Sequence, residues 1–86
     1  MFNYLVKKAK YIEGYKVWLT FADGKSGEID LSKKLKNRGG VFEPLQDVNY
    51  FKNFKIVGST IAWKNGADLA PESLYELLKQ QTKNNK

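Results

Sequence analysis

The most informative stretch of the chain is residues 15–21, which read YKVWLTF. Apolar side chains occupy every second position, and the positions between them carry Lys16, Trp18 and Thr20. A period of two is typical of a β-strand with one buried face. These residues therefore predict a half-buried strand whose second face presents a tryptophan among polar side chains.

Turn signals on both sides of this strand predict its neighbours. The Glu13-Gly14 pair precedes it and residues 22–25, ADGK, follow it. Glycine readily adopts the positive φ that tight turns need. Residues 4–12 form another apolar-rich segment, and residues 27–31 alternate again. The first third of the chain is therefore expected to be an antiparallel meander of three strands.

The middle of the chain predicts short helices. Ser32 is expected to cap a helix through residues 33–37, and the Gly39-Gly40 pair to end it in a mobile loop. Asp47 is expected to cap a second short helix over residues 48–54, whose aromatic side chains share one face. We expect this second helix to cover part of the sheet.

Two short strands and a final helix are expected after that region. The strands fall at residues 55–58 and 60–64, and Asn65-Gly66 is a turn signal. Pro71 is expected to begin a helix with a leucine stripe on one face. We therefore predict an α+β fold, in which an antiparallel sheet of about five strands carries two or three short helices.

The composition is that of one small globular domain. The chain has 86 residues, of which 42% are hydrophobic, so it is too short for two domains and too apolar to be disordered. Residues 1–78 are expected to form the domain, and residues 79–86 a polar, basic tail. Lysines interrupt the apolar residues near the N-terminus, and no apolar run approaches the roughly 18 residues of a membrane span. We expect a cytoplasmic protein with no membrane partner.

Cysteine and histidine are both missing from the sequence. Their absence excludes disulfides, thiolate nucleophiles, Cys/His zinc sites and imidazole acid–base catalysis. Asp23, Asp30, Asp47 and Asp68 are candidates for a carboxylate pair or a magnesium site. Turns and a helix start explain most of them, and only Asp68 is kept as a recognition residue. We expect no catalytic residue, no metal site and no cofactor.

The formal charge of +6 comes from 15 Lys and Arg against 9 Asp and Glu. One group of lysines lies at residues 7–10. The candidate basic patch comprises Lys33, Lys34, Lys36 and Arg38. Such clusters make weak, salt-sensitive nucleic-acid binding an alternative function. The chain has a single arginine, however, and arginine is the usual bidentate reader of base edges.

The two tryptophans lead to different expectations. Trp18 lies opposite the apolar side of its strand, so it is either a binding platform or part of a second core under a helix. Exposure of Trp18 beside Lys16 would favour binding. Trp63 fits the core, but it also stands close to polar residues at the following turn. The candidate interaction surface therefore comprises Trp18, Trp63, Asn65, Gly66 and Asp68.

Residues 63–71, WKNGADLAP, followed by Leu74-Tyr75, carry a resemblance to a known family. They resemble the C-terminal signature of a bacterial family called domain of unknown function 2442, which reads Trp-x-Asn-Gly-x-Asp-Leu, then Pro, then Leu-Tyr. The resemblance covers about residues 4–78. Earlier pieces stand in the same order: Gly14-Tyr15, Phe21-x-Asp23-Gly24, Ile29-Asp30-Leu31, Phe42-x-x-Leu45 and Phe51.

The resemblance implies a small α+β domain without an established activity. Members are often encoded beside another small protein, in pairs that look like toxin–antitoxin modules, which implies a binding role. Some relatives carry an additional DNA-binding helical domain after this one. The present chain stops at Lys86, so we do not expect that DNA-binding role here.

Three functions are therefore considered. The first is a non-catalytic protein-interaction or regulatory module, such as the antitoxin-like partner of a small protein, with sheet edges open to strand addition or dimerisation. The second is nucleic-acid binding, which should weaken with salt and with charge reversal at Lys33, Lys34 and Lys36. The third is an enzyme using Asp68 and Lys64, whose activity Asp68→Asn should abolish.

Overall fold

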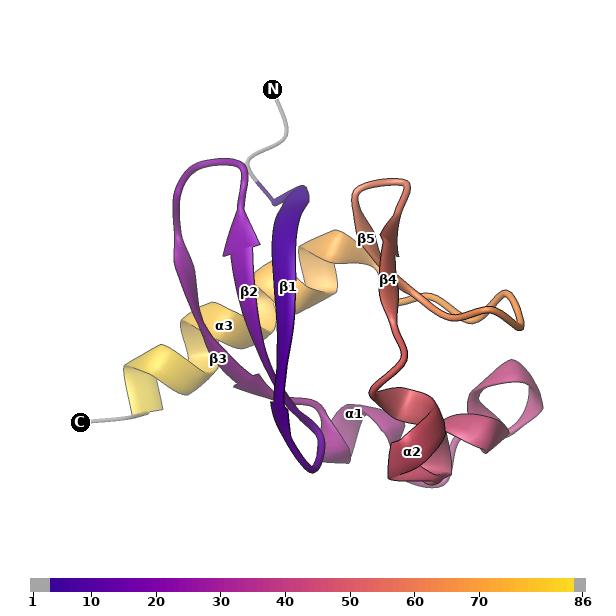
Figure 1. Ribbon diagram of the computed structural model, residues 1–86. Coiled ribbons are helices and arrows are strands. Elements are labelled where there is room, and N and C mark those ends of the chain that lie inside the picture. Colours follow the sequence, from indigo (N-terminus) through magenta and orange to yellow (C-terminus); the bar gives the residue numbers. More distant parts are fainter. Residues whose placement is uncertain (1–3, 85–86) are drawn as a thin grey trace.

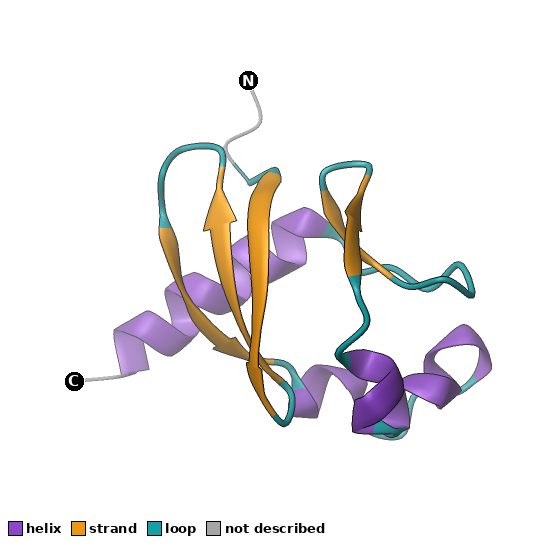
Figure 2. Cartoon of the chain, viewed as in Figure 1, coloured by secondary structure: helices purple, strands orange, loops and turns teal. Residues whose placement is uncertain are grey.

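The computed structural model describes residues 4–84, with side chains described for residues 4–81 (Figure 1). Strands and helices are mixed irregularly along this part of the chain (Figure 2), which confirms the α+β class. No helix within it is long and apolar enough to cross a membrane. The elements are β1 (Val6–Glu13), β2 (Lys16–Phe21), β3 (Ser26–Asp30), α1 (Ser32–Leu35), the 3-10 helix η1 (Gly40–Gln46), α2 (Val48–Phe51), β4 (Lys55–Val57), β5 (Thr60–Ala62) and α3 (Pro71–Asn84).

The predicted N-terminal meander is confirmed. Strands β1, β2 and β3 form an antiparallel sheet in chain order. The turn after β1 contains Gly14 at φ +53°, and the turn after β2 contains Gly24 at φ +88°. Both values lie in the left-handed region that glycine adopts without steric cost. The register then places Trp18 of β2 between Lys10 of β1 and Glu28 of β3.

Helix α3 runs behind the three-stranded sheet in Figure 1 and covers one of its faces. Gly27 of β3 lies so close to Leu78 of α3 that a Cβ atom there would stand 2.7 Å from the Leu78 Cδ1. The apolar residues of β2 are buried on this side. With the leucine stripe of α3 they belong to one core, which comprises Val6, Val17, Leu19, Phe21, Ile29, Leu31, Leu35, Leu45, Phe51, Ile61, Trp63, Ala67, Leu69, Leu74 and Leu78.

The five strands are divided between two sheets instead of forming one. β4 and β5 make a separate antiparallel hairpin beside β1. The Val6 N–H donates to the Ser59 carbonyl at 2.9 Å, but no ladder continues from that bond along β1. The register of β1 shifts between Val6 and Lys8 and again between Tyr11 and Glu13. Such irregularities bend and twist a strand, so the edge of β1 diverges from β4.

The short helices differ in detail from the expectation. Ser32 is the first residue of α1 and does not cap it; instead the Asp30 carboxylate accepts the Ser32 N–H at 2.9 Å. The predicted cap at Asp47 is confirmed, because its carboxylate accepts the Asn49 N–H at 2.9 Å. The expected loop at Gly39-Gly40 is short, since Gly40 already begins η1.

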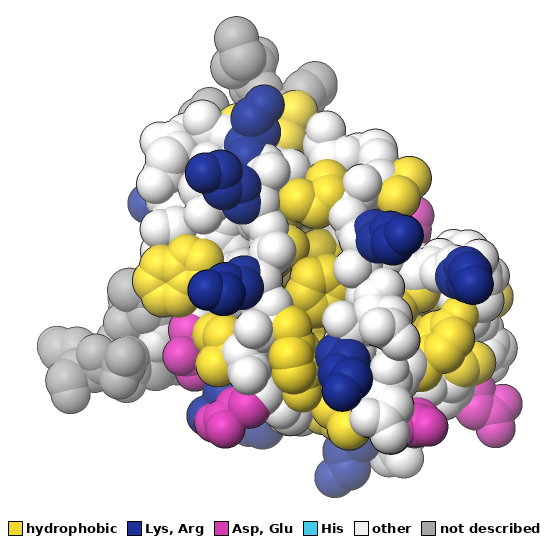
Figure 3. Space-filling model, in the orientation of Figure 1, with side chains coloured by type: hydrophobic (Ala, Val, Ile, Leu, Met, Phe, Trp, Pro, Cys, Tyr) yellow, Lys and Arg dark blue, Asp and Glu magenta, His cyan; other side chains and the backbone are white. Residues whose placement is uncertain are grey.

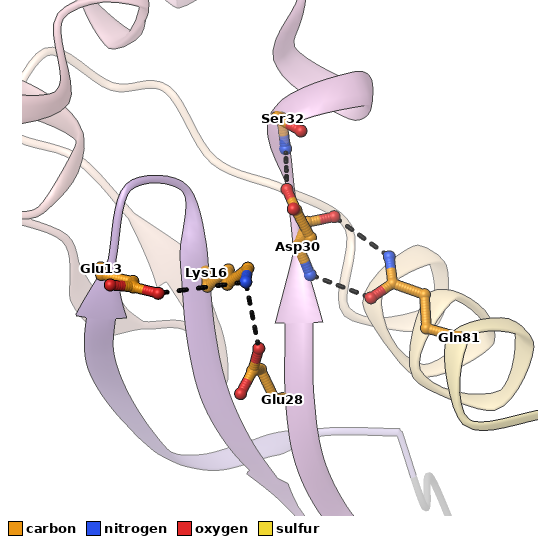
Figure 4. A network of polar contacts seen from close by, with 6 residues as sticks. All are labelled: Glu13, Lys16, Glu28, Asp30, Ser32 and Gln81. Atoms are coloured by element: carbon orange, nitrogen blue, oxygen red, sulfur yellow. Dashed lines mark hydrogen bonds and ion pairs between the residues drawn. The ribbon is translucent and has the colours of Figure 1, made fainter. Parts of the chain in front are cut away.

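Helix α3 begins at Pro71, as predicted, and continues to Asn84, past the expected start of the tail. Gln81 anchors this extension of the helix to β3 (Figure 4). Its Oε1 accepts the Asp30 N–H at 2.9 Å, and its Nε2 donates to the Asp30 carbonyl at 3.0 Å. The side-chain amide thus pairs with the outer edge of β3 as a neighbouring strand would, and ties the last turns of α3 to the sheet.

Candidate interaction face

The face of the three-stranded sheet opposite α3 is open. Cross-strand pairing puts Lys10 beside Trp18, and Lys8 beside Thr20, on this face. Trp18 is 44% exposed, although its strand neighbours Val17 and Leu19 are fully buried. Trp18 is therefore not buried under a helix, which was one of its two predicted roles. The other predicted role, a binding platform, stays a prediction.

Trp18 is continuous with two other exposed apolar side chains. It lines one shallow hollow with Ile56 of β4 and an adjoining one with Ile12 of β1, and Lys10 belongs to both hollows. Ile12 is 39% exposed and Ile56 is 40% exposed. We call Ile12, Trp18 and Ile56 the Trp18 strip. Its members come from three strands, and it crosses the boundary between the two sheets.

The border of the Trp18 strip is basic. Lys7, Lys8 and Lys10 line the hollow that holds Trp18 and Ile56, and no acidic residue lines it. None of these three lysines makes an ion pair within residues 4–81. Figure 3 shows this side of the molecule, with apolar and lysine surface mingled over β1 and β4 and acidic side chains mostly along the lower border.

Lys16 lies at one end of the open face, and two glutamates neutralise its positive charge (Figure 4). Its Nζ lies 4.0 Å from a carboxylate oxygen of Glu13 and 3.9 Å from one of Glu28. Exposed pairs at such distances contribute little to stability. They do balance the charge at this end, so the surplus positive charge of the face is concentrated at residues 7–10.

Trp63 is almost completely buried, which corrects its place in the candidate interaction surface. Its side chain is 5% exposed, and its indole N–H donates to the Phe51 carbonyl at 2.8 Å. The rings of Phe51 and Phe54 lie 5.8 and 6.4 Å from it, centroid to centroid. A buried indole with a satisfied N–H is a core residue.

The other three members of the candidate surface lie in the segment between β5 and α3. The Asn65 amide donates to the Val41 carbonyl at 2.8 Å and accepts the Ala67 N–H at 3.1 Å, while Gly66 takes φ +93°. Asp68 is exposed and forms a backbone bridge with Ala62. These contacts hold the loop against η1. Figure 1 places this loop on the far side of β4 from β2, so the structure does not bring it together with Trp18.

The candidate basic patch is likewise dispersed. Lys33 and Lys36 are exposed on and just after α1, while Lys34 is half-buried and shares a hollow with Glu72 and Glu76. Arg38 lies over the ring of Phe42, 4.0 Å from its centroid. Arg38 is thus engaged with an aromatic ring, and Lys34 has acidic residues near it.

The aspartates occupy structural positions. Asp23 accepts the Tyr75 hydroxyl and the Lys25 N–H, and these bonds lower the pKa of its carboxyl below the usual value. The pKa of Asp30 is also lowered, chiefly by its hydrogen bonds with Ser32. Across residues 4–81 no three acidic side chains gather in a way that could hold a metal ion.

The residues that sequence reasoning missed are Ile12 and Ile56. Each lies in a strand that was predicted, but exposure of an aliphatic side chain cannot be inferred from alternation alone. Ile56 reaches Trp18 only because the β4–β5 hairpin lies beside β1. The lysine group at residues 7–10 was the available signal, since it marks a strand with a solvated face.

Comparison with known proteins identifies a family. The family model described as protein of unknown function (DUF2442) matches residues 6–80, and the chain belongs to that family. This confirms the resemblance seen in the sequence. No curated protein and no solved structure matches the chain.

Proposed function

We propose that this DUF2442 domain is a non-catalytic protein-interaction module that binds a partner through the Trp18 strip. The observation that carries the proposal is a half-exposed tryptophan that shares hollows with two exposed isoleucines, bordered by lysines that make no ion pair with the described residues. Core side chains would be covered by other elements, and these three are exposed. They also lie together, whereas exposed apolar residues with no binding role are usually scattered singly over a surface. Contiguous apolar surface with a polar rim is the usual anatomy of a protein interface.

The strip favours a protein over a nucleic acid. Ile12 and Ile56 are aliphatic, and they offer no ring on which a base could stack. Unpaired Lys7, Lys8 and Lys10 favour a partner whose rim is acidic, and such complementarity mainly raises the association rate. A small protein with apolar side chains amid carboxylates fits these properties. In this proposal the domain acts in the cytoplasm as the regulatory, antitoxin-like member of a pair.

Trp18 should provide most of the binding energy. Tryptophan is enriched among interface residues whose truncation costs about 2 kcal/mol or more. That cost corresponds to a roughly 30-fold loss of affinity. The lysines should instead make binding weaken moderately with salt, because they lie at the solvated border.

The test is affinity capture from a lysate of the native host, with and without nuclease and at two salt concentrations. Three tagged proteins are compared: the unaltered chain, Trp18→Ala, and Val41→Ala. Val41 is 47% exposed but lies in η1, away from the strip, so it controls for loss of an exposed apolar group. We expect one stoichiometric small protein, retained by Val41→Ala and lost by Trp18→Ala, that survives nuclease.

Two outcomes would contradict the proposal. One is equal capture of the partner by Trp18→Ala and the unaltered chain. The other is recovery of nucleic acid alone, only at low salt, which would transfer the function to the basic residues. Charge reversal at Lys33, Lys34 and Lys36 would then show whether the candidate basic patch binds the nucleic acid.

A further inference from the structure

A second hollow shares no residue with the Trp18 strip. It is bounded by α2, β4 and the end of β5, and its volume is about 560 Å³. Small-molecule sites typically enclose 300–1,000 Å³. We call it the α2–β4 groove. Its floor is aromatic and its rim is cationic.

The cations of the α2–β4 groove come from three places in the chain. Lys52 follows α2, Lys55 begins β4 and Lys64 follows β5. All three are exposed, and none makes an ion pair in the described part of the chain. No acidic residue lines the groove. Three exposed lysines that line one hollow, and that make no ion pair with the described residues, favour a compact, multiply charged anion.

The floor adds a requirement for a flat apolar group. Phe54 is partly exposed and stands at 81° to Trp63, whose indole is held in the core by its bond to Phe51. A planar ring stacked on the exposed part of Phe54 would make the kind of aromatic contact that rings prefer. Tyr50 also lines the groove, and its hydroxyl makes no hydrogen bond with residues 4–81.

We propose that the α2–β4 groove binds a nucleoside phosphate, with its base against Phe54 and its phosphates among Lys52, Lys55 and Lys64. A nucleoside phosphate matches both features of the groove. An inorganic anion would leave the aromatic floor uncovered, and an uncharged ring would leave the lysines without a counter-charge. The same chemistry occurs in a free nucleotide and in a phosphorylated single strand. The inference is independent of the proposed protein interface.

The test is a titration of the ¹⁵N-labelled full chain, followed by amide chemical shifts. The probes are ADP, adenosine, inorganic phosphate and a short single-stranded oligoadenylate. We expect ADP to shift amides of residues 50–55 and 62–64, with at least tenfold weaker binding of adenosine and of phosphate. Tighter binding of ADP than of the oligonucleotide would identify a free nucleotide as the source, and the reverse order a strand.

Matched variants separate the groove from general electrostatics. Lys52→Ala/Lys55→Ala/Lys64→Ala should weaken ADP binding at least tenfold. The triple alanine variant at Lys33, Lys34 and Lys36 loses the same charge and should change it less than twofold. Phe54→Leu, which keeps an apolar side chain against the core, should weaken ADP binding about fivefold and leave phosphate binding unchanged.

The proposal is overturned by no ADP shifts at millimolar concentration, by equal losses in the two triple variants, or by phosphate binding as tightly as ADP. An oligoglutamate peptide that shifts the same amides at lower concentration than ADP would also overturn it and assign the groove to an acidic protein. Trp18→Ala should leave ADP binding intact, so failure of this inference is distinguishable from failure of the protein interface.

Discussion

The two faces of the three-stranded sheet come from the same alternating strands but have opposite surroundings. On one face Val17, Leu19 and Phe21 join a single core with residues of α3. On the other, Trp18 stands between Lys10 and Glu28, and no element of residues 4–84 covers it. Burial of a strand residue therefore depends on what packs over its face. Hydrophobicity alone would have buried Trp18 with its neighbours.

The largest expected difference between the faces is in the free energy of unfolding. Leu19→Ala should lower it by about 2–5 kcal/mol, because the variant loses apolar burial and leaves a cavity. Trp18→Ala removes a larger side chain but should lower the free energy of unfolding by about 1 kcal/mol or less, since Trp18 is solvated. Urea unfolding of both variants measures this, and equal losses would mean that the open face is covered.

Gln81 offers a second way to examine the covered side. Gln81→Ala removes both hydrogen bonds to the backbone of Asp30 and should cost about 1–2 kcal/mol. Hydrogen exchange at the Asp30 amide should accelerate with it. Gln81→Glu keeps an acceptor for the Asp30 N–H but has no donor for the Asp30 carbonyl. Its stability should therefore lie between that of the unaltered chain and that of Gln81→Ala. An unchanged exchange rate in Gln81→Ala would show that α3 does not need this contact.

The close approach of β3 to α3 is open to a finer test. Gly27→Ala places a Cβ 2.7 Å from Leu78 Cδ1, and Leu78 is 1% exposed, so it has little room to move. We expect a loss of about 1 kcal/mol from overpacking. Leu78→Val removes the clashing methyl, so the double variant should lose less than the sum of the single ones. Strict additivity in urea unfolding would argue against the contact.

The smallest effect concerns the pH dependence of stability. The pKa of Asp30 is lowered in the folded chain, mainly by its hydrogen bonds with Ser32. A depressed pKa stabilises the fold above the unfolded value of about 3.9, and that contribution disappears as pH falls through the folded value. Asp30→Asn should therefore lose less stability than the unaltered chain between pH 5 and pH 2. Parallel curves from urea unfolding across this range would contradict the assignment.

Local pattern was enough to predict much of the fold. The alternation in residues 15–21 and the glycines at residues 14 and 24 predicted β2 and both turns around it, because strand period and positive φ are local properties. The cap at Asp47 and the start of α3 at Pro71 were predicted for the same reason. The ordered motifs ending in WKNGADLAP were enough to identify the family.

The candidate site depended on contacts between residues far apart in the chain. The local pattern favoured the core for Trp63 but left the exposure of Trp18 open, because that exposure depended on whether another element packs over the second face of β2. Ile56 joins Trp18 only because the β4–β5 hairpin lies beside β1, and Lys52, Lys55 and Lys64 line one groove only because α2, β4 and the end of β5 lie together. Local sequence determined the elements, because backbone preference acts over a few residues. Tertiary packing determined the exposed surfaces, because burial depends on neighbours that the local sequence does not specify.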